Sequence, residues 1–375
     1  MKIALITRRF EPNGGGTERD LIASARCLVE AGHDITIYAG EVRAPSTEWR
    51  IRTVATPPLG RALRLLIFAR SAGALARAEG NDLILSFARI IDADILRSGG
   101  SAHASYLRAA RRWRNSAGAI AMKLAPYHII QRMIERRGFH SARLKKAIAV
   151  SDLVRDDLIR EFRMAPDRVV TLYNGVDLMR FAPARDSTAR RQLRQTIAIP
   201  DDAPVVLFIG NGFARKGLRF LLRAAGQAKR KMWLMVAGND RAIDSYQRLA
   251  RRLRISPRVL FLGAQARVER LFEMADVLAL PSLFEPFGNV ALEAMAAGLP
   301  VVTSAQCGVT ALLPPALRPF VIQHPSDPGE IAARLTALLE VRGTELGEAA
   351  RATAEQFSWQ RYAIGLTAIV ETLSK

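Results

Sequence analysis

Cysteine and long apolar runs are both scarce in this chain of 375 residues. Its two cysteines, Cys27 and Cys307, are too far apart and too few for a disulfide framework or a metal site, which favours a reducing compartment. No window approaches the roughly 18 uninterrupted apolar residues of a membrane-spanning helix, and the apolar run after Met1 is too short for a signal peptide. These absences predict a protein that is cytoplasmic or peripheral to a membrane.

Acidic residues are also in deficit, because 55 Lys and Arg stand against 35 Asp and Glu and leave a formal net charge of +20. More than half of this excess lies between Arg97 and Lys146, where Glu135 is the single acid. The twelve basic residues of this basic segment are Arg97, Arg108, Arg111, Arg112, Arg114, Lys123, Arg132, Arg136, Arg137, Arg143, Lys145 and Lys146. The interleaved aromatic residues are Tyr106, Trp113, Tyr127 and Phe139. Such a segment suits an anionic membrane surface, a nucleic acid or a merely solvated face.

Short β-branched runs alternate with longer amphipathic stretches throughout, which predicts βαβ units and parallel sheets. In the first half the expected strands are Lys2–Thr7, Asp34–Ala39, Arg52–Thr56, Asp82–Phe87, Ala147–Ser151 and Val169–Tyr173. In the second half they are Val205–Gly210, Trp233–Gly238, Val259–Gly263, Val277–Pro281, Val301–Ser304 and Phe320–Gln323. Two such series indicate two doubly wound domains of roughly 150–200 residues, with ligands beyond the carboxyl ends of the strands.

Two carboxylates, Glu285 and Glu293, lie on either side of a predicted transition from a loop to a helix. Pro286 and Gly288 mark the loop, and the helix is expected over 290–297. Backbone amides at the start of this helix would point outward with the positive end of its dipole, which makes an anion site. Glu293 lies about one turn into the helix, within reach of a hydroxyl beside the anion. The pattern predicts a phosphate-linked sugar bound at a helix N-terminus.

The segment from Phe284 to Val302, with its two glutamates eight residues apart, resembles the donor-binding segment of the family 4 glycosyltransferases. The connector from Asn174 to Pro183 resembles the interdomain segment of that family, and 357–362 resembles the start of its C-terminal crossover. The resemblance implies the GT-B fold, in which two doubly wound Rossmann-like domains face each other across a cleft.

The resemblance also implies a division of labour between the domains. Residues 1–183 would bind the acceptor, and residues 184–356 would bind the nucleotide sugar. A C-terminal helix within 357–375 would cross back to the first domain.

Several site residues follow from the resemblance and from local chemistry. Arg215 and Lys216 lie between glycines after a predicted strand, where cations can neutralise a leaving diphosphate. Many family members have an arginine where this chain has Asn211, and Arg215 is the candidate to replace it. His103 matches a histidine that contacts the transferred sugar, and Asp20 is the candidate to hold an acceptor hydroxyl.

The complete prediction names one site with three kinds of residue. The acceptor-binding residue is Asp20, and the catalytic residues are His103, Arg215, Lys216 and Glu285. The donor-binding residues are Gly15, Gly16, Phe287, Gly288, Asn289, Val290 and Glu293. No metal or other cofactor is expected, because the D-x-D triplet at Asp92–Asp94 lies in a sheet pattern that belongs to the metal-independent GT-B fold.

The predicted activity is retaining transfer of a hexose, glucose by preference, from a nucleotide sugar such as a UDP-hexose. The whole-chain resemblance favours a lipopolysaccharide-core or other glycolipid acceptor at the inner face of the cytoplasmic membrane. This function favours an anionic membrane surface rather than nucleic acid as the partner of the basic segment. Alternatives are another glycan or small-molecule acceptor, or a GT-B nucleotide-sugar epimerase. A nucleic-acid-binding protein would leave Glu285 and Glu293 unexplained.

Overall fold

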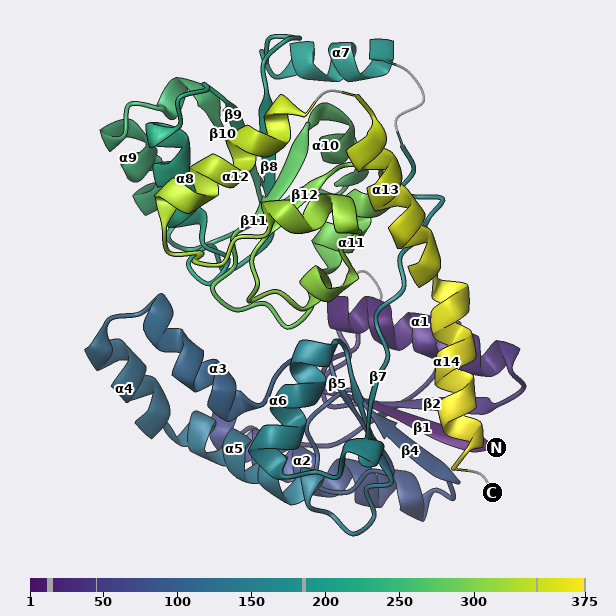
Figure 1. The fold of residues 1–375 in the computed structure, drawn as a ribbon. Helices are drawn as coiled ribbons and strands as arrows, with labels where there is room; N and C mark the ends of the chain where they lie inside the picture. The colour runs from purple at the N-terminus through teal and green to yellow at the C-terminus, as the bar shows by residue number, and fades with distance from the viewer. Residues whose placement is uncertain (12–15, 45, 184–186, 342, 374–375) are drawn as a thin grey trace. The chain divides into compact units, whose positions relative to one another are not determined.

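The computed structural model describes residues 1–11, 16–44, 46–183, 187–341 and 343–373. The chain divides into two compact α/β units, each built on its own sheet (Figure 1). Unit 1 consists of Met1–Gly175 and Trp359–Lys375, and unit 2 consists of Val176–Ser358. The chain thus leaves unit 1 directly after Gly175, a few residues before the boundary expected from the sequence.

Unit 1 contains a seven-stranded parallel sheet in the order β3-β2-β1-β4-β5-β6-β7. Its strands are β1 (Lys2–Thr7), β2 (Asp34–Ala39), β3 (Arg50–Thr53), β4 (Leu83–Ser86), β5 (Ile95–Ser98), β6 (Lys146–Ala149) and β7 (Val169–Thr171). The central strand β1 is buried along Ile3–Ile6, as expected for a strand covered on both faces. The strand order reverses between β1 and β4, so the loops after these two strands flank a topological switch point.

The helices of unit 1 are α1 (Gly16–Glu30), α2 (Arg61–Ala78), α3 (His103–Ala109), α4 (Ser116–Leu124), α5 (Pro126–Phe139), α6 (Asp152–Phe162) and α14 (Trp359–Glu371). The C-terminal helix α14 packs along α1, which confirms the predicted crossover to the first unit (Figure 1). It buries Tyr362, Leu366 and Val370 in the same core as β1 and β2. These three positions are four residues apart and therefore form one stripe of the helix.

Unit 2 contains a five-stranded parallel sheet in the order β10-β9-β8-β11-β12. Its strands are β8 (Val205–Ile209), β9 (Trp233–Ala237), β10 (Val259–Gly263), β11 (Val277–Leu280) and β12 (Val301–Thr303). Its helices are α7 (Ser187–Thr196), α8 (Leu218–Gln227), α9 (Ile243–Arg252), α10 (Glu269–Met274), α11 (Asn289–Ala296), α12 (Pro328–Glu340) and α13 (Glu345–Ala354). The switch point of this sheet lies between β8 and β11. Among all described helices, none is both long and apolar enough to cross a membrane.

The structure differs from the predicted strands in three places, and the first is a shift, since the strand expected over Arg52–Thr56 runs over Arg50–Thr53. Strand β5 was not expected, because Arg97 interrupts a run of only four residues that would otherwise read as an apolar strand. The strand expected over Phe320–Gln323 is wrong, since Pro315–Phe320 forms a 3₁₀ helix and only an isolated bridge joins Ile322 to Ser304. Pro315 and Pro319 lie in that 3₁₀ helix, and proline fixes its φ at about −65°, the value of a helical turn rather than of a strand.

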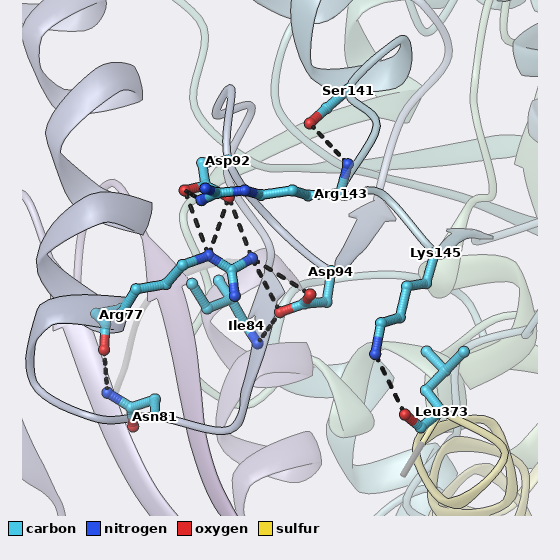
Figure 2. Close-up of polar contacts among 10 residues, drawn as sticks. Arg77, Asn81, Ile84, Asp92, Asp94, Ser141, Arg143, Lys145 and Leu373 are labelled. Carbon is cyan, nitrogen blue, oxygen red and sulfur yellow. Dashed lines mark hydrogen bonds and ion pairs between the residues drawn. The ribbon is translucent and has the colours of Figure 1, made fainter. Parts of the chain in front are cut away.

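The D-x-D triplet has a structural function in unit 1 (Figure 2). Arg77, in the last turn of α2, donates to Asp92 at 3.1 Å and to Asp94 at 3.2 Å through the same Nη2. Asp94 also accepts from the backbone amide of Ile84 at the start of β4, and Arg143 donates to Asp92 at 2.7 Å. Both carboxylates are therefore neutralised at the amino edge of the sheet, the edge opposite to the one where ligands of such folds bind.

Candidate functional site

The predicted catalytic residues of unit 2 lie at the carboxyl edge of its sheet, on both sides of the switch point. Arg215 and Lys216 follow β8, and Glu285 follows β11, the strand that pairs with β8. Because parallel neighbours end at the same edge, residues about 70 positions apart in the sequence become neighbours in space. The structure thus brings together three of the residues that the sequence singled out.

A single carboxylate oxygen joins these three side chains. Lys216 Nζ donates to Glu285 Oε2 at 2.7 Å, and Arg215 Nη1 donates to the same oxygen at 3.0 Å. Arg215 Nη1 also donates to the carbonyl of Phe284 at 2.6 Å. The Lys216 and Glu285 side chains are only 10% and 12% exposed. Burial raises the pKa of Glu285, but the two cations outweigh it and hold that pKa below its usual range.

Glycines let Lys216 reach this position. A Cβ on Gly210 would lie 2.4 Å from Lys216 Cε, so the lysine stem crosses the end of β8 where no side chain can stand. Gly217 has a φ of +81°, and a Cβ there would lie 2.0 Å from the carbonyl oxygen of Pro281. The loop after β8 can therefore pack this closely against the loop after β11 only because residues 210 and 217 are glycines.

Asn211, the position where many family members have arginine, has a structural contact here. Its side-chain oxygen accepts from the backbone amide of Asn239 at 2.8 Å. Asp240 accepts from the amide of Phe213 at 2.7 Å, so both bonds join the loop after β8 to the loop after β9. The loop that carries the two cations is thereby fixed on this side as well.

The loop that carries Glu285 is held by backbone bonds to the segment after β12. The amide of Glu285 donates to Gln306 at 3.0 Å, and the amide of Gly308 donates to the carbonyl of Glu285 at 3.0 Å. Val309 donates to the carbonyl of Phe287 at 2.8 Å. These bonds, together with the two cations, fix both the backbone and the side chain of Glu285.

Helix α11 begins directly after this loop, at Asn289 and Val290, and its predicted start at residue 290 is correct to within one residue. Gly288 precedes it with a φ of +102°, where a Cβ would lie 2.8 Å from the sulfur of Cys307. Burial raises the pKa of Cys307 to about 12, so its thiol is neutral. Glu293 lies one turn into the helix and is 9% exposed. The N-terminus of α11, whose first amides could bind an anion, and a carboxylate one turn further on thus lie beside the Lys216–Glu285 pair.

In unit 1, the predicted site residues lie on two helices, Gly16 and Asp20 on α1 and His103 on α3. Gly15 lies outside the described residues, and Gly16 is the first residue of α1. Asp20 lies one turn further along α1, buried, with its carboxylate 3.3 Å from Arg97 Nη1. Burial raises the pKa of Asp20 even though Arg97 and Arg19 oppose this shift. In this structure the Asp20 carboxylate is engaged by Arg97, and its acceptor function stays a prediction.

Arg97 is the hub of a buried polar cluster. Its Nε donates to the hydroxyl of Tyr362 on α14 at 3.1 Å, and its Nη2 donates to the side chain of Asn174. The Tyr362 hydroxyl also lies 2.8 Å from that of Ser24. Arg97 belongs to the basic segment, but it is buried, with only 1% of its side chain exposed. We call Arg97, Asp20, Asn174, Tyr362 and Ser24 the Arg97 cluster.

His103 lies at the start of α3 and contacts a second histidine. Its Nε2 lies 2.8 Å from Nδ1 of His128, in the first turn of α5. The backbone amide of His103 donates to Glu135 at 2.8 Å, and Glu135 is buried and paired with Arg89. Burial, His128 and nearby arginines lower the pKa of His103 to about 4, so this imidazole is neutral at physiological pH.

Sequence reasoning did not find His128 or the function of Glu135. His128 belongs to no motif, and α5 reads as a generic amphipathic helix. Glu135 is the one acid of the basic segment, and that isolation was the only sequence signal of its pairing with Arg89.

Several other members of the basic segment have partners within unit 1. Arg108 pairs with Glu161, Arg143 pairs with Asp92, and Lys145 and Lys146 donate to backbone carbonyls. Six further arginines have exposed side chains, namely Arg111, Arg112, Arg114, Arg132, Arg136 and Arg137. Three apolar side chains on α4 and α5 are also exposed, namely Ile120 (53%), Leu124 (68%) and Ile129 (50%). We call these three apolar residues and six arginines the α4–α5 surface.

The residues described contain no group of three or more His, Cys, Asp or Glu side chains that could hold a metal ion. In unit 2 the candidate functional residues are two cations, one fixed carboxylate and a helix N-terminus, and in unit 1 they are a neutral histidine pair.

Comparison with solved structures identifies the fold. WaaG, a glycosyltransferase involved in lipopolysaccharide biosynthesis, matches 97% of this chain and 99% of its own at a TM-score of 0.78 and 21% identity. HepE of Anabaena, solved in complex with UDP and glucose, matches 100% of both chains at a TM-score of 0.75 and 20% identity. At these identities the likeness establishes the fold, which is the predicted GT-B fold.

Sequence relatives carry the comparison further. An uncharacterized glycosyltransferase of Methanocaldococcus jannaschii is 30% identical over 225 residues, which cover 58% of this chain and 57% of the relative. D-inositol 3-phosphate glycosyltransferase 2 of Catenulispora acidiphila is 36% identical over 231 residues, which cover 57% of this chain and 53% of the relative. The matches therefore span just over half the length of these curated relatives.

Two family models account for nearly the whole chain. The model described as Glycosyltransferase Family 4 matches residues 14–180, in unit 1 and the connector, and the model described as Glycosyl transferases group 1 matches residues 189–357, in unit 2. Between them the matches leave out only the two ends and a short connector. The chain belongs to the family 4 glycosyltransferases of the GT-B fold.

Proposed function

We propose that this protein is a retaining glycosyltransferase that moves a hexose from a UDP-sugar, with UDP-glucose as the preferred donor, to a phosphorylated glycolipid of the lipopolysaccharide-core type. The observation that carries the proposal is the buried Lys216–Glu285 pair beside the N-terminus of α11. A fixed cation and a helix N-terminus both stabilise negative charge that grows on a leaving diphosphate.

Each residue of unit 2 then has a stated function. Lys216 and Arg215 stabilise the leaving diphosphate, and the first amides of α11 bind its oxygens. Glu293 accepts from the ribose hydroxyls of the nucleotide, and Glu285 accepts from hydroxyls of the transferred sugar. In unit 1, Gly16 at the start of α1 binds next to the donor phosphates, and His103 orients the sugar and supports positive charge at its anomeric carbon. A neutral imidazole suits that function, because a protonated one would repel such charge.

The donor is tested first by thermal unfolding with UDP, GDP, ADP and their hexose conjugates, since a ligand that binds only the native state raises the midpoint. We expect a rise with UDP and UDP-glucose that is absent in Glu293→Ala. Lys216→Ala should abolish transfer and keep the fold, whereas Lys229→Ala, which changes an exposed lysine of the same unit, should leave both unchanged. No shift with any nucleotide, or near-normal turnover in Lys216→Ala, would contradict the proposal.

The α4–α5 surface supports the membrane part of the proposal. Helix α4 buries only Ala119, so its apolar face is left to solvent beside the six exposed arginines. Basic side chains near an anionic bilayer each contribute about 1 kcal/mol, and apolar side chains add their own burial in the interface. We therefore place the protein peripherally on an anionic membrane, where a phosphorylated glycolipid would be presented to it.

Vesicle binding separates this assignment from a merely solvated basic face. Binding to vesicles that contain anionic lipid should weaken steeply with salt, and Leu124→Glu should weaken it at constant salt by removing the most exposed apolar side chain of α4. Met179→Glu, which changes a side chain that is 86% exposed in unit 2, serves as the control. Equal binding to neutral and anionic vesicles would count against the membrane assignment.

A second acceptor class is favoured by the sequence relatives, several of which are D-inositol 3-phosphate glycosyltransferases. The second candidate function is transfer of the same hexose to a soluble phosphorylated polyol. Parallel assays with UDP-glucose and either a phosphorylated core glycolipid or inositol phosphate distinguish the two. If product forms with inositol phosphate and not with the glycolipid, the acceptor is the polyol, and the proposed donor site is unaffected.

A further inference from the structure

Two histidines from different helices form a close pair in unit 1. Nε2 of His103 lies 2.8 Å from Nδ1 of His128, and the two rings lie edge to edge, with centroids 5.0 Å apart and planes 18° apart. At that distance one nitrogen must carry the proton and the other must accept it. The contact therefore fixes the tautomers of both rings at once.

The surroundings fix the position of His103 in two other ways. Its backbone amide donates to the buried carboxylate of Glu135, which is itself held by Arg89 at 3.0 Å. The ring of Tyr106 also stacks on the ring of His103, with centroids 5.8 Å apart. Within the described residues, His128 is the only partner that hydrogen-bonds the imidazole of His103.

Burial and the cations around the pair keep both rings neutral. Arg89 and Arg132 act on His103, and Arg61 on α2 and Arg114 act on His128. Glu135 accepts from the backbone amide of His103, and no acidic side chain among the described residues hydrogen-bonds either imidazole ring. Burial and these cations lower the pKa of both histidines, so one mobile proton, rather than two, lies in the contact at neutral pH.

The neutral pair has two possible arrangements. In the first, Nε2 of His103 donates to Nδ1 of His128, and both rings are Nε2–H tautomers. In the second the proton belongs to Nδ1 of His128, and both rings must then be Nδ1–H tautomers. The first arrangement is favoured, because Nε2–H is the intrinsically preferred form of a neutral histidine side chain and no described group holds a proton on either Nδ1.

We propose that His128 is a positioning residue that holds His103 as its Nε2–H tautomer, so that Nδ1 of His103 offers a lone pair to a hydroxyl of the transferred sugar. This inference rests on the proposed function, in which His103 contacts that sugar. Nδ1 of His103 has no hydrogen-bond partner among the described residues, and a sugar hydroxyl is a donor of suitable chemistry. His128 thereby selects an acceptor, rather than a donor, for the substrate-facing nitrogen of His103.

Two substitutions of His128 separate the hydrogen bond from the packing of the ring. His128→Asn keeps an acceptor near the position of Nδ1 but removes the ring, whereas His128→Phe keeps a ring but removes the acceptor. We expect His128→Phe to lower kcat for UDP-glucose turnover about three- to tenfold, the rate equivalent of one net hydrogen bond, with KM for the donor changed less than about twofold. His128→Asn should stay closer to wild type, and His140→Asn, at the exposed end of the same helix, should have no effect.

The tautomer itself is read without turnover. Two-bond ¹⁵N–¹H correlation spectra of the protein labelled at its five histidines show which nitrogen of His103 carries the proton, with assignment by single substitution. We expect Nε2–H for His103 in the wild type and a mixture of tautomers in His128→Phe. A wild-type Nδ1–H form, an unchanged spectrum in His128→Phe, or loss of kcat in His128→Asn but not in His128→Phe would overturn the inference.

Failure of the proposed function gives a different result. If the wild-type protein bound and turned over no nucleotide sugar, the substrate-facing function of His103 would be overturned whatever its tautomer. If the donor is turned over but His103 is found as the Nδ1–H tautomer, only the positioning function of His128 is overturned.

Discussion

Replacing Arg97 by methionine tests whether the Arg97 cluster holds unit 1 together. The substitution keeps an unbranched stem and removes the guanidinium, which has three polar partners, one on α1, one on α14 and one at the start of the connector. Asp20, whose side chain is only 7% exposed, would then be a buried carboxylate without its cation. Breaking one side of such a pair costs about 3–5 kcal/mol, out of a total stability of roughly 5–15 kcal/mol for a domain.

The expected loss in Arg97→Met is therefore about 3–5 kcal/mol in the free energy of unfolding of unit 1. Adding Asp20→Asn should restore part of this loss, since the double variant no longer buries an unpaired charge, and the coupling between the two changes should reach about 1–3 kcal/mol. The control is Arg50→Met, because Arg50 pairs with Asp34 where both side chains are about half exposed, and such a pair contributes less than about 1 kcal/mol.

Urea unfolding followed by tryptophan fluorescence gives the measurement. A Trp233→Phe background leaves Trp49, Trp113 and Trp359, all of which lie in unit 1. Trp359 packs edge-on against Tyr362, with ring centroids 5.3 Å apart, and so reports directly on the C-terminal helix. If the free energy of unfolding falls no more in Arg97→Met than in Arg50→Met, the Arg97 cluster does not stabilise unit 1.

The same experiment decides the function of Asp20. If Asp20 is chiefly the counter-ion of Arg97, Asp20→Asn destabilises unit 1 and changes acceptor KM only through that loss. If it holds an acceptor hydroxyl, as the sequence resemblance predicts, Asp20→Asn raises acceptor KM while the urea midpoint stays close to wild type.

Three further predictions concern single positions. Folding lowers the pKa of Glu285, so the ionised carboxylate stabilises the protein fully above pH 4.5, the ordinary pKa of a glutamate. This stabilisation is lost as the pH falls through the lower pKa of the folded state. Glu285→Gln should therefore reduce the fall of Tm at acid pH. His103 binds its proton near pH 6.5 when unfolded but only near pH 4 when folded, so stability should fall as pH drops from about 6.5 to 4, and His103→Gln should remove that part of the loss. Gly217→Ala should lower the free energy of unfolding by about 1–3 kcal/mol or more, as measured by urea unfolding, because it combines a positive φ with a clash against the carbonyl of Pro281. Gly80→Ala, with a φ of +78° and open space around it, isolates the cost of the backbone conformation; an equal loss in both variants would show that the clash is relieved.

The alternation of apolar strands and amphipathic helices was enough to predict two parallel sheets, because a strand buried on both faces has to be apolar along its length. The same criterion did not predict strand β5, because that strand contains Arg97. Arg97 is buried although it is charged, since it pairs with Asp20. Glycine and proline spacing likewise predicted the loop and start of α11, because those residues restrict the backbone locally.

The sequence by itself thus determined the family, the GT-B fold and the local chemistry of the segment around Glu285. Only the tertiary structure decided which of these residues meet. Lys216 and Glu285 pair because β8 and β11 are neighbours that end at one edge of the sheet, and His128 reaches His103 because α5 packs on α3. Propensity and spacing act over a few residues, whereas an ion pair or a shared proton depends on distances that only the folded chain sets.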